Sequence, residues 1–244
     1  FKKNVKKGNV KNLFLQAHQS AGNTVTLASS FEFDQADVKF MRFMPVISDG
    51  VGYGTFEKDE LVLTLKSGYV KASQGGKVTF DGSVMRVPNT RIPEPPATFI
   101  LRGRGPIHAT MSLLDNKPFQ ISTKAKREVD DVSGQIIFEA QVSTWLKKGV
   151  KPKDVDFDIS GVLQNIRSEV LVPERILLAK TMALSVNPTA LKISGAGSLS
   201  GVPFTGRWIQ PLGAPGLASQ VVAMLELSAK SLIALNIELP NNSI

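Results

Sequence analysis

Asp154–Gly161, DVDFDISG, alternates polar and apolar residues without a break. Leu61–Gly68 (LVLTLKSG) and Leu191–Leu199 (LKISGAGSL) alternate in much the same way. A period of two places successive side chains on opposite faces of a β-sheet. The recurring pattern therefore predicts a chain built largely of strands, with one face of the sheet apolar and the other polar.

The composition fits a packed protein with a basic surface. The chain has 244 residues, of which 42% are hydrophobic, and 29 Lys and Arg against 21 Asp and Glu give a net charge of +8. A basic surface favours anionic partners such as lipid head groups or nucleic acid. Apart from a group between Lys2 and Lys11, the basic residues are scattered, and no stretch interleaves them with aromatic residues for base stacking. We therefore expect no nucleic-acid partner.

Several chemistries and targeting signals are missing from the sequence. Cys is absent, which removes disulfides, thiolate metal ligands and thiol nucleophiles. No stretch approaches the roughly 20 apolar residues that a membrane-spanning helix requires. The chain begins at Phe1 without a visible signal peptide. We therefore expect a fragment of a longer protein whose targeting or anchoring segment lies elsewhere.

The chain divides into two similar halves. The polar residues 124–131 predict a boundary, which gives a first β-groove module at residues 1–128 and a second at residues 129–244. The pattern of Thr24–Gly82 is similar to that of Asp154–Gly206, which indicates weak internal repetition. Glycines at short intervals predict a meander of antiparallel hairpins, with a break at Gly68.

Short helices are expected at three places. Within residues 105–114, a Gly-Pro pair is followed by apolar residues at i, i+4 and i+7, which predicts a helix with one apolar face. Ser228 is placed to cap a last helix over Ala229–Asn236. A short turn of helix is expected at Thr144–Lys148.

Candidate catalytic and metal-binding residues are few. His18 and His108 are the two histidines and do not form a close pair, so we expect no metal site. Asp154, Asp156 and Asp158 fit either a cation or acid–base site or a solvated outer face, and the lack of a calcium-loop pattern favours the solvated face. The sequence therefore predicts no enzyme, no catalytic residue and no cofactor.

Three alternating glycines, at positions 50, 52 and 54, invite comparison with phosphate-binding loops. They lack the strand-to-helix context of a dinucleotide site, and the chain lacks the Gly-Lys-Ser/Thr ending of a nucleotide-binding loop. These glycines indicate a bulge in a strongly twisted sheet instead.

The apolar sheet face remains as the candidate site. The pattern alone favours a closed sandwich or barrel core, and an open trough for an apolar ligand is the alternative. Few amphipathic helices are available to cover the sheet, and an open trough needs a lipid or a partner to fill it. The residues assigned to lipid binding on this face are Leu27, Phe31, Phe33, Leu61, Leu63, Leu65, Phe80, Phe138, Val155, Phe157, Ile159, Leu184 and Ile193.

The order of several short motifs resembles the AsmA-like family of bacterial envelope proteins, in its YhdP-type branch. Gly195–Trp208 (GAGSLSGVPFTGRW) is similar to the C-terminal part of an AsmA-like repeat. The resemblance runs from about Val10 to Pro240. Its other segments are Phe40–Gly52, which is similar to a Leu-Pro-Pro-Ile segment, Leu61–Gly68, which is similar to the strand that follows, Val84–Pro88, which is similar to a Phe-x-Val-Pro element, and Ile107–Lys117, which is similar to a short Ala-Leu-x-Leu-Leu-Asp helix.

The resemblance implies a module of a bridge-like lipid transporter. Its fold is all-β, with repeated modules forming a large curved antiparallel sheet, a groove or incomplete barrel, and two or three short helices. Such a protein extends through the periplasm, is anchored in the inner membrane by a segment outside this chain, and carries phospholipid towards the outer membrane along neighbouring β modules of the same full-length chain. The alternative is a structural or assembly protein of the envelope that acts through its β edges.

Overall fold

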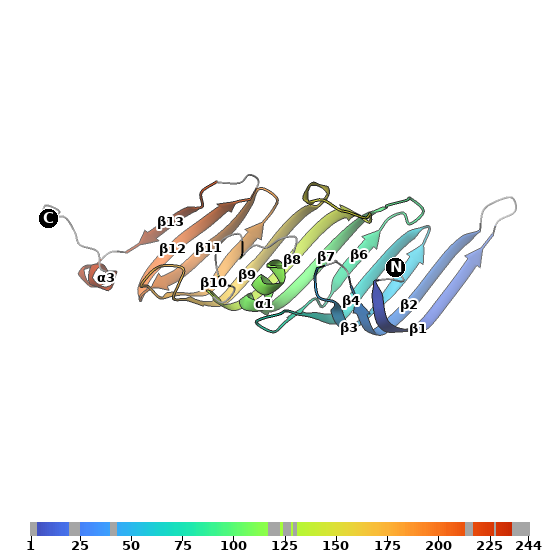
Figure 1. Ribbon diagram of the computed structural model, residues 1–244, viewed down its shortest axis with the longest axis horizontal. Coiled ribbons are helices and arrows are strands. Elements are labelled where there is room, and N and C mark those ends of the chain that lie inside the picture. The colour runs from blue at the N-terminus through green and yellow to red at the C-terminus, as the bar shows by residue number, and fades with distance from the viewer. Residues whose placement is uncertain are drawn as a thin grey trace.

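The computed structural model describes residues 4–19, 25–39, 43–116, 123, 128, 131–212, 217–226 and 228–235. It consists of one antiparallel sheet of 13 strands that follow one another along the chain (Figure 1). The strands are β1 (Val5–His18), β2 (Thr26–Val38), β3 (Ile47–Glu57), β4 (Glu60–Lys71), β5 (Lys77–Thr79), β6 (Ser83–Val87), β7 (Pro96–Pro106), β8 (Ser133–Trp145), β9 (Asp156–Ser168), β10 (Leu177–Val186), β11 (Ala190–Leu199), β12 (Val202–Pro211) and β13 (Gln220–Leu225). The helices are α1 (Ile107–Leu114), α3 (Ala229–Ala234) and the 3₁₀ turn η1 (Pro152–Asp154).

The predicted fold class is confirmed: strands make up 65% of the structure, and the antiparallel sheet is curved and open. Each strand pairs with the one before it, except that the short β5 and β6 both lie between β4 and β7. Short connections between long antiparallel strands give this meander directly. The predicted break at Gly68 is wrong, because β4 continues through it and the register shift near Lys66 is absorbed as a bulge.

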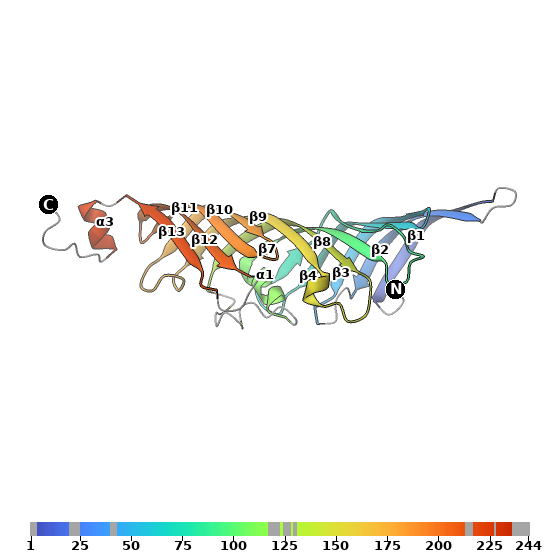
Figure 2. The same ribbon diagram turned by 90° about the horizontal axis from the view of Figure 1, so that it is seen from above.

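Bulges interrupt the pairing of several strands. Gln35 in β2, Asp49 in β3 and Asn165 in β9 have φ angles of 48°, 52° and 51°, and the register shifts at each of them. An extra residue on one strand bends it and increases its twist. The sheet accordingly curves along its length instead of lying flat (Figure 2).

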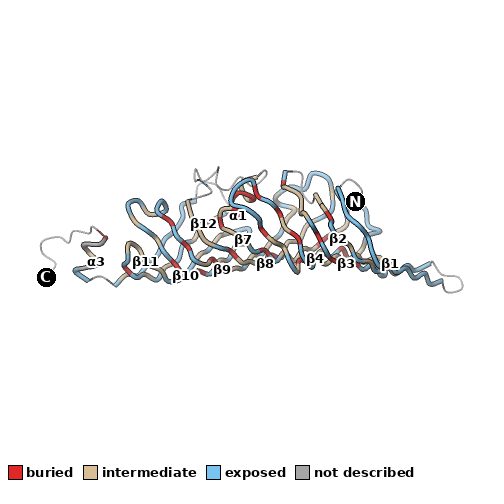
Figure 3. Tube along the Cα trace, turned by 90° about the horizontal axis from the view of Figure 1, so that it is seen from below, coloured by how far each residue is buried: buried red, intermediate tan, exposed pale blue. Residues whose placement is uncertain are grey.

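Helix α1 packs on one face of this curved sheet, which we call the inner face. Ile107 contacts a cluster that includes Ile136, Leu163 and Met182. At the other end of the helix, Ala109 and Leu113 belong to a second cluster with Val70, Ala72 and Val78. Buried residues gather on α1 and the middle strands, whereas β1 is exposed throughout (Figure 3).

The predictions for the helices were partly correct. Helix α1 begins and ends within the predicted segment, and Ser228 Oγ accepts a hydrogen bond of 3.1 Å from the backbone N–H of Ser231 at the start of α3. The helical turn predicted at Thr144–Lys148 is wrong, because β8 continues to Trp145. The end of the last predicted helix, Asn236, lies outside the described residues.

The sheet is continuous across the predicted boundary between the two modules. Strands β7 and β8 flank that boundary and pair from Pro96 opposite Trp145 to Pro106 opposite Gln135. Most of residues 124–131, on which the boundary was predicted, lie outside the described residues. The division into two modules stays a prediction.

Candidate functional site

The inner face can be followed across the sheet through directly paired residues, whose side chains lie on the same side. One such row joins Phe31 of β2, Gly54 of β3, Leu63 of β4, Met85 of β6, Phe99 of β7, Val142 of β8 and Phe157 of β9. Val142 shares its parity in β8 with Ile136, which packs against Ile107 of α1, so the two side chains lie on the same face. The row therefore lies on the face that carries α1.

The structure places the sequence-predicted residues on this one face. Leu27, Phe31 and Phe33 share parity in β2, and Leu27 is 47% exposed near the start of that strand. Val155 is half-buried and lies just before β9, outside any strand. The other residues, brought together by strand register or by cluster packing, are Leu61, Leu63, Leu65, Phe80, Phe138, Phe157, Ile159, Leu184 and Ile193.

Charge is segregated between the two faces. Alternation and register place the charged residues of β2 to β9, β11 and β12 on the outer face, and Lys180 of β10 is exposed at a register shift. Arg86, Arg102 and Glu139, for example, alternate with Met85, Leu101 and Phe138, which lie on the inner face. An unpaired charge inside an apolar layer is very costly, whereas the same charge facing water is not. Along β2 to β9 and β11 to β13, the inner face thus offers hydrocarbon, a few hydroxyl groups and the amide of Gln210, and no charge.

The outer face is held by ion pairs between neighbouring strands. The Arg102 guanidinium donates to the Glu139 carboxylate at 2.8 Å, and Arg86 pairs with Glu60. Lys77 Nζ lies 3.6 Å from the centre of the Tyr69 ring. Each of these charged groups already interacts with a neighbour on the solvent-exposed face. The charged residues of the outer face therefore need no ligand to explain them.

The carboxylate row predicted at Asp154, Asp156 and Asp158 is split. Asp156 and Asp158 are exposed, on the outer face of β9. Asp154 lies in η1, where it accepts a hydrogen bond of 2.9 Å from the backbone N–H of Lys151 and pairs with Lys147 at 3.1 Å. The Lys151 N–H and then Lys147 lower the pKa of Asp154. No group of three or more His, Asp or Glu side chains able to hold a metal occurs among the described residues.

The inner face has a covered part and an open part. Where α1 packs on the sheet, Val78 of β5 and Ala109 of the helix are both 0% exposed. Away from α1, residues such as Phe33, Leu63 and Phe157 are only half-buried, shielded by their neighbours in the sheet. The helix contacts β5, β7 and β8 and packs against Val70 near the end of β4, so apolar surface on β2, β3 and the Leu61–Leu65 part of β4 remains accessible.

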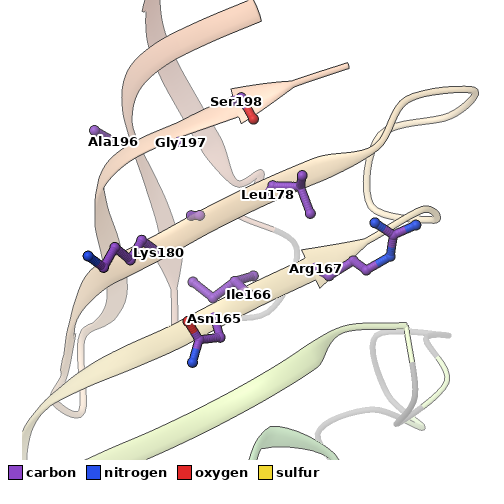
Figure 4. A pocket seen from close by; sticks show the side chains of 9 residues that line it. Asn165, Ile166, Arg167, Leu178, Lys180, Ala196, Gly197 and Ser198 are labelled. Carbon is purple, nitrogen blue, oxygen red and sulfur yellow. The ribbon is translucent and has the colours of Figure 1, made fainter. Parts of the chain in front are cut away.

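A hollow on the outer face lies beside the bulge at Asn165 (Figure 4). It is lined by Leu178 and by the polar side chains of Asn165, Arg167 and Lys180, with Ser198 on the next strand. Arg167 pairs with Glu169, so its charge already has a partner. The hollow shows none of the converging acid and base groups that a catalytic site needs.

Sequence reasoning missed several residues that line the inner face. Met85, Val142 and Trp208 share it with the predicted residues. Parity within each strand was the available signal, because each of the three has a polar or charged neighbour on at least one side. Trp208 is 37% exposed and lies opposite Ile193, which extends the face to β12.

The chain matches no protein-family model, no curated protein and no solved structure. None of the helices in the described parts of the chain has the length and hydropathy needed to cross a membrane.

Proposed function

We propose that the inner face binds the acyl chains of phospholipids and conducts them across the strands without covalent chemistry. The observation that carries this proposal is the segregation of charge: the inner face of a 13-stranded sheet, covered only in part by α1, has no charged side chain in β2 to β9 or in β11 to β13. An exposed apolar surface of this extent marks a site for a ligand or partner.

The chemistry of this face favours a hydrocarbon chain over a peptide. A peptide brings N–H and C=O groups that need hydrogen-bond partners once they leave water. The backbone groups of the central strands are already paired within the sheet. An acyl chain has no such groups and loses nothing by entering.

The length of the face allows movement. At about 4.8 Å per strand, the sheet is roughly 55 Å long. One leaflet of a bilayer core, and hence one acyl chain, spans about 15 Å. Each buried methylene contributes about 0.8 kcal/mol, and a chain that slides to the next strand exchanges one apolar contact for another. The net change in buried area during sliding is small, so the barrier is low.

The cellular setting of the proposal follows the motif order. Gly195–Trp208 and the segments that precede it resemble AsmA-like repeats. On that basis we place the chain in the periplasm, as one module of an inner-membrane-anchored protein that moves phospholipid between the two membranes and supports the outer-membrane barrier. Neighbouring β modules of the full-length chain would lengthen the trough.

A matched pair of variants in β4 tests this function. Leu63 lies on the inner face and Thr64, the next residue, on the outer face. The protein is incubated with vesicles of phosphatidylglycerol and phosphatidylethanolamine, reisolated and examined by native mass spectrometry. We expect bound phospholipid on the wild type and on Thr64→Glu, and at least about a tenfold loss on Leu63→Glu, since a tenfold change is only about 1.4 kcal/mol.

Circular dichroism checks that both variants keep their strands. A lipid-free wild type, or equal lipid loss in the two folded variants, would contradict acyl-chain binding on the inner face.

Assembly through a sheet edge is a second candidate function, favoured by one observation. The edge strand β1 is exposed along its whole length, with Phe14 at 64% on the outer face and Leu15 at 65% on the inner face. Exposed edges of this kind pair with strands of other molecules. Sedimentation velocity of wild type and Leu15→Lys tests it: concentration-dependent association that the variant abolishes supports assembly, and a monomeric wild type opposes it.

A further inference from the structure

Four phenylalanines of the inner face lie directly opposite glycines on the neighbouring strand. The pairs are Phe31 with Gly54, Phe33 with Gly52, Phe138 with Gly103, and Phe204 with Gly197. In each pair the phenylalanine ring occupies the space that the Cβ atom of a larger residue would need at the glycine position. A Cβ added to Gly54 would lie 2.4 Å from Phe31 Cζ, and one added to Gly103 would lie 2.1 Å from Phe138 Cζ.

These rings therefore lie across the sheet. A ring opposite any residue larger than glycine has to point away from the sheet, into the trough, because the two side chains of a directly paired position are only about 5 Å apart. Glycine removes that obstacle, so the ring can lie along the sheet and contribute apolar surface to the inner face.

The distribution of the glycines argues against a purely structural role. Gly52 and Gly54 face inward in β3, as do Gly103 in β7, Gly161 in β9 and Gly197 in β11. Glycines that served only to weaken or twist a strand would occur on either face. On the outer face of β3, by contrast, Tyr53 lies opposite Thr64.

We propose that the paired phenylalanines and glycines set the depth of the trough and so determine which acyl chains it accepts. This inference rests on the proposed lipid-binding function. The low floor leaves room for chains with methyl branches, which are wider than straight chains. Raising a ring makes the trough shallower and favours straight chains.

Gly54→Ala is the sharpest variant for the test. Its added methyl group meets side-chain atoms only, those of Phe31 and Leu63, whereas one added to Gly52 meets the backbone oxygen of Thr64 at 2.0 Å. The Phe31 ring is then lifted while the strands stay paired. Phe31→Leu removes the ring, and the double variant Gly54→Ala/Phe31→Leu restores the depth. Thr55→Ala, on the outer face of the same strand, is the control.

The probe is vesicles with equal amounts of dioleoyl and diphytanoyl phosphatidylglycerol, and the measurement is the ratio of branched to unbranched lipid on the reisolated protein. We expect Gly54→Ala to lower this ratio about fourfold relative to wild type, the equivalent of about 0.8 kcal/mol or one methylene. Phe31→Leu should raise it, and Thr55→Ala and the double variant should leave it near the wild-type value.

The outcomes separate this inference from the proposed function. A wild type that takes up neither lipid overturns both. A wild type that takes up lipid, with unchanged ratios in Gly54→Ala and Phe31→Leu, overturns the role of the paired rings and leaves lipid binding standing. If Gly54→Ala fails to fold, the ratio for Phe31→Leu decides alone.

Discussion

The part of the sheet beneath α1 and the part formed by β2, β3 and residues 61–65 of β4 share one apolar face but differ in burial. Beneath the helix, Val70 and Val78 are 1% and 0% exposed. In the open part, Phe31 and Leu63 are only half-buried, on strands just as well paired. Sheet pairing alone therefore does not bury this face; a covering element does. The covered part accounts for much of the stability, and the open part keeps apolar surface available.

The largest expected effect comes from truncating one leucine in each part. Leu113 of α1 is 7% exposed in the covered cluster, and Leu63 lies in the open part. We expect Leu113→Ala to lower the free energy of unfolding by about 3 kcal/mol, because it leaves a cavity, and Leu63→Ala to lower it by about 1 kcal/mol, because its site is already partly solvated. Urea denaturation measures both; equal losses would erase the distinction between the two parts.

A smaller loss of stability is expected where the turn at residues 73–76 contacts α1. Ser112 Oγ lies 2.8 Å from Ser73 Oγ and accepts a hydrogen bond of 3.2 Å from the backbone N–H of Gln74. The turn approaches α1 so closely that Gly75, with φ at +78°, has no room for a side chain next to Ala109 N. Ser112→Ala leaves a partly buried N–H without its partner, at a cost of about 1–2 kcal/mol.

That cost should come with faster hydrogen exchange in α1 and unchanged exchange in β2 and β3. Exchange that rises equally in all three elements would mean that the covered and open parts unfold as one unit, contrary to the comparison.

The smallest effect is expected at the connection between β8 and β9, whose described residues belong to neither of the two core clusters. The Lys151 N–H and Lys147 lower the pKa of Asp154 below its unfolded value. A depressed carboxyl pKa stabilises the fold above the unfolded pKa, and that stability is lost as pH falls through the folded pKa. We expect Asp154→Asn to make the fall in unfolding temperature with decreasing pH slightly less steep. Thermal unfolding measured from about pH 6 to about pH 3, a range that includes the ordinary carboxyl pKa, checks this.

Leu113→Ala should leave the same acid dependence intact, which makes it the control for Asp154→Asn. An equal change of the pH profile in both variants would show that the connection and the covered part are coupled.

Much of the fold could be predicted because its signals are local. Alternation assigned Leu61, Leu63 and Leu65 to one face, and the i, i+4, i+7 spacing located α1. The errors arose where a neighbouring strand decides the outcome. Thr144 continues β8 because it pairs with Ala97, and Gly68 stays within β4 because its neighbour Tyr69 pairs with Ser48.

The residues of the candidate site could be predicted from the sequence, but the way in which they are paired across the strands could not. The inner face holds the predicted residues, yet the opposition of Phe31 and Gly54 depends on register between strands that local sequence does not specify. The three glycines at 50, 52 and 54 were expected to mark a bulge, and one does occur at Asp49. Gly52 and Gly54 instead make room for rings, which only the paired strand reveals.

Local sequence was sufficient to show that this protein has two-faced strands, because a strand's period of two is a local property of the backbone. The tertiary structure decided that the strands form one continuous open sheet and that α1 covers only part of its apolar face. Alternation fixes which side chains share a face. Whether a second layer covers that face depends on contacts between residues far apart in the chain, and no local pattern encodes them.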